Sequence, residues 1–114
     1  KVLVVDDDPL IRRMLGQVFV LEDHQLLTAE NTDQADALWQ LEQFDLVISD
    51  LDMPGAKGDV ILAKYKKHTP SVITVLFSGR TEAVNDANRS SIDLILAKPM
   101  SSTEVFEQIK AKFG

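Results

Sequence analysis

Carboxylates directly follow two apolar runs of this sequence, where they could act together in chemistry. Asp50 comes shortly after the mostly apolar run 44–48, and Asp6 and Asp7 come directly after the run 2–5. Both runs are rich in Val, Ile and Leu, which is typical of buried strands. A single aspartate after a strand is often only a turn residue, so the grouping of several carboxylates is the informative observation.

Two further polar side chains follow apolar runs later in the chain. Ser78 follows the run 72–77, and Lys98 follows the run 92–97. If these runs are parallel strands, their carboxyl ends share one edge of the sheet, where open α/β sheets bind ligands. Carboxylates gathered at one edge repel unless a cation joins them, and Mg²⁺ binds one or two carboxylates together with phosphate oxygens and water. Carboxylate, Mg²⁺, lysine and hydroxyl are the groups that transfer a phosphoryl group onto an aspartate.

Apolar runs that alternate with amphipathic segments predict the elements that position these side chains. We expect strands over 2–5, 24–29, 45–49, 72–77 and 92–97, and helices over 9–21, 33–43, 59–67, 82–88 and from 102 onward. Asp8 and Thr32 are predicted to cap the first two helices. The spacing of the apolar residues in the first helix favours a stripe made of Leu10, Met14, Val18 and Leu21. Nearly continuous apolar strands that alternate with helices predict an α/β sandwich with a parallel five-stranded sheet covered on both faces.

Length and composition limit the classes of protein that the chain can be. The sequence has 114 residues, enough for one domain with a core and too few for two. Its net charge of -6 argues against direct binding of nucleic acid, which needs a basic face. No apolar run is long enough to cross a bilayer, so no membrane partner is expected. The sequence has no cysteine, which excludes disulfides and leaves the cytoplasm as the default compartment.

Together these residues resemble the receiver domain of two-component response regulators, the CheY-like superfamily, along essentially the whole chain. The resemblance rests on four pieces: Asp6-Asp7, Asp50-Leu51-Asp52-Met53-Pro54 with Gly58, Ser78-Gly79, and Lys98-Pro99. It implies a flavodoxin-like sheet of strand order 2-1-3-4-5. The expected receiver domain spans residues 1–114, and its excision from a longer protein stays open.

The resemblance also implies a role for each residue of the site. Asp50 would accept a phosphoryl group from a phosphohistidine on a sensor histidine kinase or phosphotransfer protein, and Lys98 and Ser78 would contact that group. Such a domain catalyses only its own phosphorylation and dephosphorylation, and it changes conformation to regulate a partner or an attached output domain. The Mg²⁺ ligands would be Asp7 and Asp50 through side chains, Asp6 mostly through water, and the backbone carbonyl of Asp52.

Further positions follow from the same resemblance. Asp52, Gly79 and Arg80 would flank the phosphoryl group, and a cis peptide is expected before Pro99. An ion pair between Asp52 and Arg80 and two separate exposed side chains are equally compatible with the sequence. Ile95 departs from the family, which commonly has an aromatic residue three positions before the lysine. The expected partners are thus a kinase or phosphotransfer protein, an unknown output domain or effector, and, as an open option, a second copy in a phosphorylation-linked dimer.

Two other functions fit parts of the sequence. Asp50 and Asp52 with Ser78 and Lys98 also resemble the haloacid-dehalogenase phosphatases, but those usually have Thr or Val where this chain has Pro54, and an acidic metal-binding pair after the lysine. A receiver-like module that docks or dimerises without using phosphate is the second alternative. The aliphatic Ile95 favours it, whereas the complete set of pocket residues argues against it.

Overall fold

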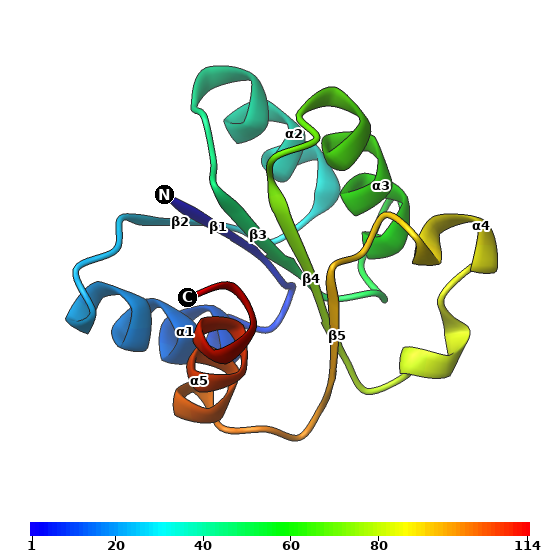
Figure 1. The fold of residues 1–114 in the computed structure, drawn as a ribbon. Coiled ribbons are helices and arrows are strands. Elements are labelled where there is room, and N and C mark those ends of the chain that lie inside the picture. The colour runs from blue at the N-terminus through cyan, green and yellow to red at the C-terminus, as the bar shows by residue number, and fades with distance from the viewer.

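The computed structural model describes residues 1–114 and contains five strands that alternate with helices (Figure 1). The strands are β1 (Val2–Val5), β2 (Leu26–Ala29), β3 (Leu46–Ser49), β4 (Ile73–Ser78) and β5 (Leu94–Ala97). The helices are α1 (Pro9–Leu21), α2 (Thr32–Leu41), α3 (Gly58–His68), α4 (Asp86–Arg89) and α5 (Ser102–Phe113), with a 3₁₀ turn η1 at Thr81–Ala83. None of these helices is both long and apolar enough to cross a membrane.

All strands pair in parallel in the order β2-β1-β3-β4-β5, which confirms the predicted flavodoxin-like topology. Helices α1 and α5 cover one face of the sheet, and α2 and α3 cover the other (Figure 1). The strand order reverses between β1 and β3, because the chain first adds β2 on one side and later β3 to β5 on the other. This switch point at the carboxyl ends of the strands is where open α/β folds bind ligands.

Each strand contributes to both halves of the core, since successive side chains of a strand point to opposite faces. In β1, Val2 and Val4 pack toward α1 and α5, whereas Leu3 and Val5 pack toward α2 and α3. All four side chains are at most 3% exposed. Burial on both faces explains why the strands read as continuous apolar runs rather than as alternating patterns.

The buried face of α1 differs from the predicted stripe. Leu15 and Phe19 are buried against the sheet and α5, whereas Leu10 is 51% and Leu21 is 82% exposed. The apolar residues of this helix form a wide stripe, and periodicity alone selected the edge of that stripe that reaches solvent at both ends.

Three other local predictions were wrong. The cap of α2 is Asn31, whose side chain accepts a hydrogen bond from the Gln34 amide, whereas the Thr32 hydroxyl accepts from the Ala56 amide. The helix predicted over 82–88 is instead a 3₁₀ turn followed by the four-residue α4. Between them Val84 is extended and buried, which anchors the segment to the core but interrupts helical hydrogen bonding. The strand predicted from residue 24 begins at Leu26.

Candidate functional site

The polar residues predicted to act together follow or end four adjacent strands of the sheet. Asp6 follows β1, Asp50 follows β3, Ser78 ends β4 and Lys98 follows β5. The backbone hydrogen bonds of the sheet continue to this edge, since the Asp50 amide donates to the Val5 carbonyl and the Lys98 amide donates to the Ser78 carbonyl. Parallel pairing therefore brings together side chains that are up to 92 positions apart in the sequence.

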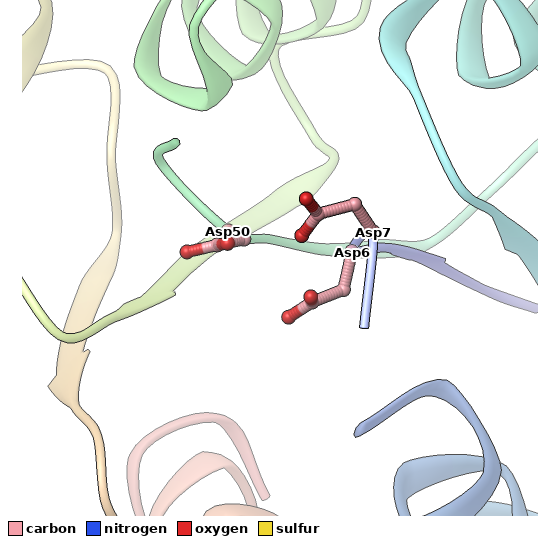
Figure 2. A group of neighbouring side chains, drawn as sticks. All are labelled: Asp6, Asp7 and Asp50. Atoms are coloured by element: carbon pink, nitrogen blue, oxygen red, sulfur yellow. The ribbon is translucent and has the colours of Figure 1, made fainter. Parts of the chain in front are cut away.

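Three carboxylates form the centre of this edge. Asp6, Asp7 and Asp50 each place an oxygen within 4.8 Å of the others. Figure 2 shows the Asp6 and Asp7 side chains extending from the end of β1 toward the side on which Asp50 lies. Asp6 and Asp50 are buried, whereas Asp7 is exposed and makes no hydrogen bond with its carboxylate. The cluster thus has two fixed acidic groups and one that faces solvent.

Lys98 supplies the positive charge nearest to this cluster. Its Nζ lies 3.0 Å from Asp6 Oδ2 and 3.6 Å from Asp50 Oδ1, and its side chain is 23% exposed. The Nζ also lies 5.5 Å from the centre of the buried Phe77 ring. The peptide bond between Lys98 and Pro99 is cis, the conformation expected from the resemblance. Lys98 therefore reaches the acidic group over an apolar surface and binds Asp6 more closely than Asp50.

The electrostatic surroundings disfavour the charged form of Asp50. Burial raises the pKa of Asp50, and the nearby Asp6 and Asp7 raise it further. Lys98 and the hydrogen bond from the Leu51 amide act in the opposite direction without cancelling the rise. Oδ1 accepts that bond at 2.8 Å, whereas Oδ2 accepts no hydrogen bond and is accessible to solvent. Asp50 is therefore a poorly solvated carboxylate with one oxygen free to react or to bind a cation.

The backbone around Asp50 is held by close contact with the start of α3. The Gly58 amide donates to the Leu51 carbonyl at 2.9 Å, and the Ser49 hydroxyl donates to the Asp50 carbonyl at 2.8 Å. A Cβ atom at position 58 would lie only 1.7 Å from the Asp50 carbonyl oxygen. Position 58 thus requires a glycine because the helix approaches the loop too closely for any side chain.

The mouth of the site carries an ion-pair group. Arg80 Nε lies 3.0 Å from Asp52 Oδ2, which decides the open question in favour of pairing. Lys57 Nζ, a residue that the sequence analysis missed, lies 2.7 Å from Asp52 Oδ1. The Lys57 hydrogen bond, and then Arg80, lower the pKa of Asp52. No pattern in the sequence indicates that Lys57, five positions after Asp52, turns back toward it.

Ser78 ends β4, Gly79 follows it, and Ile95 lies on β5. Ser78 is 1% exposed, and its hydroxyl accepts a hydrogen bond from the Arg80 amide at 3.1 Å. Gly79 has open space at its Cβ position. Ile95 pairs with Leu76 across β4 and β5 and is half-buried against the core between the sheet and α2–α3. An aliphatic side chain therefore occupies the position three residues before Lys98, where the family commonly has an aromatic residue.

The donor set suits a hard divalent cation. Mg²⁺ prefers carboxylate and carbonyl oxygens, and the cluster offers three carboxylates of which Asp7 and one oxygen of Asp50 are free of hydrogen bonds. The Asp52 carbonyl also accepts no hydrogen bond from the protein. Asp6 differs, because its two carboxylate oxygens already accept from Lys98 and from the Asp8 amide. Asp6 is thus held in place by the protein on both carboxylate oxygens.

Comparison with known proteins gives consistent matches. Residues 2–110 match the family model of the response regulator receiver domain. The transcriptional regulatory protein ResD of Bacillus subtilis is 34% identical over 113 residues, which cover 97% of this chain and 47% of that protein. The phosphate regulon transcriptional regulatory protein PhoB of Pseudomonas aeruginosa is 28% identical, over 96% of this chain and 50% of that protein. The chain thus spans about half the length of these curated relatives.

Solved structures share the fold. The response regulator protein TrrA of Thermotoga maritima, crystallised in complex with Mg²⁺-BeF, has a TM-score of 0.86 and 29% identity, with 96% of each chain covered. The receiver domain of NtrX from Brucella abortus has a TM-score of 0.85 and 27% identity, over 97% of this chain and 96% of that chain. The chemotaxis response regulator CheY4 of Vibrio cholerae has a TM-score of 0.85 at 22% identity, a likeness of fold.

Proposed function

The chain belongs to the response regulator receiver domain family, and from this premise we propose that it is a phosphoacceptor switch with Asp50 as the acceptor. A receiver domain of this family is a signalling domain and not a conventional enzyme. The observation that carries the proposal is the grouping of Asp6, Asp7 and Asp50 within 4.8 Å, with Lys98 3.6 Å from Asp50. The haloacid-dehalogenase alternative is dropped because the chain matches a different family.

Asp50 is proposed to attack the phosphorus of a phosphohistidine on a sensor histidine kinase or phosphotransfer protein. A bond from a carboxylate oxygen to phosphorus forms, the bond from phosphorus to the histidine nitrogen breaks, and the histidine leaves with its electron pair and takes up a proton. Poor solvation of Asp50 supports this role, since a carboxylate with little hydration has less water to lose before it attacks. Water later hydrolyses the acyl phosphate, so the domain catalyses only its own phosphorylation and dephosphorylation.

Mg²⁺ is the proposed cofactor, held by Asp7 and Asp50 directly, by Asp6 mostly through water, and by the Asp52 carbonyl. The bound ion supplies positive charge that offsets the charge on the carboxylates and on the phosphoryl oxygens. The solvent-facing Asp7 supports this assignment, because its carboxylate lies in the cluster without a protein partner. The Mg²⁺-BeF complex of TrrA supports it by analogy.

Lys98 and Ser78 are proposed to bind the phosphoryl oxygens. Lys98 already lies between Asp6 and Asp50, so a short movement of its flexible side chain brings the ammonium group to a phosphoryl group on Asp50. The Ser78 hydroxyl accepts a hydrogen bond from the Arg80 amide, and its own proton is free to be donated to a phosphoryl oxygen. If the hydroxyl turns toward the phosphoryl group it pulls on its bond to the Arg80 amide, so the segment after β4 is the proposed route of the conformational change.

Regulation is proposed to pass to an output domain or a separate effector. ResD and PhoB are named as transcriptional regulatory proteins, and the chain covers about half of each. The net charge of -6 makes it improbable that this domain itself binds nucleic acid, so the output lies in another domain or partner. The proposal includes a cytoplasmic location, because the expected phosphodonors are intracellular kinases, and a phosphorylation-linked dimer is one form that the output can take.

A docking module that does not use phosphate is the second candidate. Ile95 favours this candidate. An aromatic residue at this position would rotate its ring when Ser78 moves, whereas the half-buried aliphatic side chain of Ile95 has no ring and no polar group. The candidate predicts a stable interaction surface that is the same with and without a phosphodonor.

Intact mass after incubation with acetyl phosphate, with and without Mg²⁺, tests the proposal. We expect one added phosphoryl group that needs Mg²⁺ and is absent in Asp50→Asn. If no group is added, beryllofluoride separates two explanations: Mg²⁺-dependent binding of this mimic indicates a short-lived acyl phosphate, and no binding supports the docking module. Asp33→Asn serves as a matched control, since it removes an exposed carboxylate at the start of α2, outside the acidic cluster, and should still be phosphorylated.

A further inference from the structure

Arg12 connects α1 with the acidic end of the sheet. It lies on α1, but its Nη1 donates to the Asp6 carbonyl at 2.8 Å, and its Nη2 lies 3.9 Å from a carboxylate oxygen of Glu30, which follows β2. The side chain is only 20% exposed although it carries a charge. We infer that Arg12 is a positioning residue for Mg²⁺ binding, which it supports by fixing the turn that presents Asp7. This inference rests on the proposed function.

The Asp6 carbonyl depends on Arg12 for its hydrogen bond. The ladder between β1 and β2 ends where the Asp6 amide donates to the Ala29 carbonyl, and no backbone amide donates to the Asp6 carbonyl. The side-chain oxygens of Asp6 are held separately by the Asp8 amide and by Lys98. All three oxygens of Asp6 thus have donors, and Arg12 supplies the one for the backbone.

Arg12 holds the peptide that enters Asp7, and the bond from the Asp8 amide to Asp6 Oδ1 holds the peptide that leaves it. The Asp6 carbonyl and the Asp7 amide belong to the same planar peptide unit, so a bond that fixes the carbonyl also fixes the direction in which the chain enters Asp7. Neither the amide nor the carboxylate of Asp7 makes a hydrogen bond of its own. Without Arg12, this peptide can rotate at the strand end and carry the Asp7 carboxylate away from Asp50.

The charge of Arg12 and its contact with the Asp6 carbonyl have opposite expected effects on the affinity for Mg²⁺. As a cation beside the acidic cluster, Arg12 repels Mg²⁺, so removal of its charge alone should tighten metal binding. As the residue that holds the Asp6 carbonyl, its removal should weaken metal binding. Partners of this kind, which orient a metal ligand without touching the metal, typically contribute about 10- to 100-fold to affinity.

Arg13 provides a matched control. It is the next residue of α1, carries the same charge, is exposed, and forms no hydrogen bond or ion pair. The experiment measures the Mg²⁺ dissociation constant of wild type, Arg12→Met and Arg13→Met by following amide NMR signals during titration with MgCl₂. Amide hydrogen exchange of Asp8, recorded without metal, reports on the turn itself because this amide donates to Asp6.

For Arg12→Met we expect binding weakened on the order of tenfold and faster exchange of the Asp8 amide, whereas Arg13→Met should bind Mg²⁺ as wild type or more tightly. An Arg12→Lys variant, which keeps the charge and one donor, should recover part of the affinity. Equal or tighter binding by Arg12→Met than by Arg13→Met would overturn the inference while leaving the proposed function intact. Failure of the wild type to bind Mg²⁺ would instead overturn the proposed metal site, and the inference with it.

Discussion

Replacement of Gly58 by alanine is the most direct test of how the fold holds the phosphoacceptor loop. The added Cβ would lie 1.7 Å from the Asp50 carbonyl oxygen and 2.8 Å from the Ser49 hydroxyl oxygen. Ordinary contacts begin near 3.4 Å, so the carbonyl and the first turn of α3 must separate by about 1.7 Å. The nearer group, the Asp50 carbonyl, is backbone and cannot rotate away as a flexible side-chain end could.

This displacement should lower both stability and phosphorylation. Forcing extra atoms into a packed site costs about 1–3 kcal/mol, and the better helix propensity of alanine returns at most about 1 kcal/mol. We therefore expect Gly58→Ala to lose about 1–2 kcal/mol of unfolding free energy, measured by urea denaturation. A misplacement of about 1 Å at a reacting group can slow a reaction about 100-fold, so phosphorylation of Asp50 by acetyl phosphate should fall strongly.

Gly16→Ala is the matched control for this change. Gly16 lies inside α1, and a Cβ there would meet only Leu26 Cδ2 at the ordinary distance of 3.6 Å. The same substitution should therefore stabilise the protein by about 0.5–1 kcal/mol and leave phosphorylation unchanged. The reasoning would be refuted if Gly58→Ala gained stability as Gly16→Ala does and was phosphorylated at the wild-type rate.

Three further predictions concern ionisable side chains. Asp50→Asn should raise metal-free stability in urea at neutral pH, because burial and nearby carboxylates raise the pKa of Asp50; the gain should vanish once the pH falls below 3.8, where both states are protonated. Tyr65→Phe should cost about 1–3 kcal/mol in the same assay, since the buried hydroxyl donates to Asp36 at 2.7 Å, and unchanged stability would contradict this. Asp93→Asn should lower the free energy of unfolding at neutral pH and make it decrease less as the pH falls. Burial raises the pKa of Asp93, but hydrogen bonds, chiefly from Lys66, lower it overall, so its contribution is lost as pH falls through that pKa. If the stability of Asp93→Asn fell with acid as steeply as that of wild type, this contribution would be contradicted.

The sheet and the composition of its reactive edge could be predicted from the order of residues alone. Continuous apolar runs with helical segments between them specify parallel strands buried on both faces, and Asp6, Asp50, Ser78 and Lys98 stand at the ends of those runs. Parallel strands bring their carboxyl ends to one edge, so these residues are placed together by topology before any packing detail is known.

Packing determines the buried residues, the helix cap and the helix break that periodicity does not specify. The apolar stripe of α1 is wide, so only the contact of this helix with the sheet and α5 identifies Leu15 and Phe19 as its buried residues. Asn31 and Thr32 can both cap a helix, and the position of Ala56 directs the threonine to another bond. Burial of Val84 interrupts the helix that local propensity favours.

Within the site, the hydrogen-bond and ion-pair partners of each side chain could not be predicted and depend on how the chain folds. Lys98 binds Asp6 more closely than Asp50, Lys57 joins Arg80 at Asp52, and Arg12 reaches back to the Asp6 carbonyl. Long charged side chains have several carboxylates within reach, so their choice depends on where the backbone of other elements places each acceptor. Strand ends are fixed by hydrophobic burial that is encoded locally, whereas these partners are fixed by distances between segments that meet only in the folded chain.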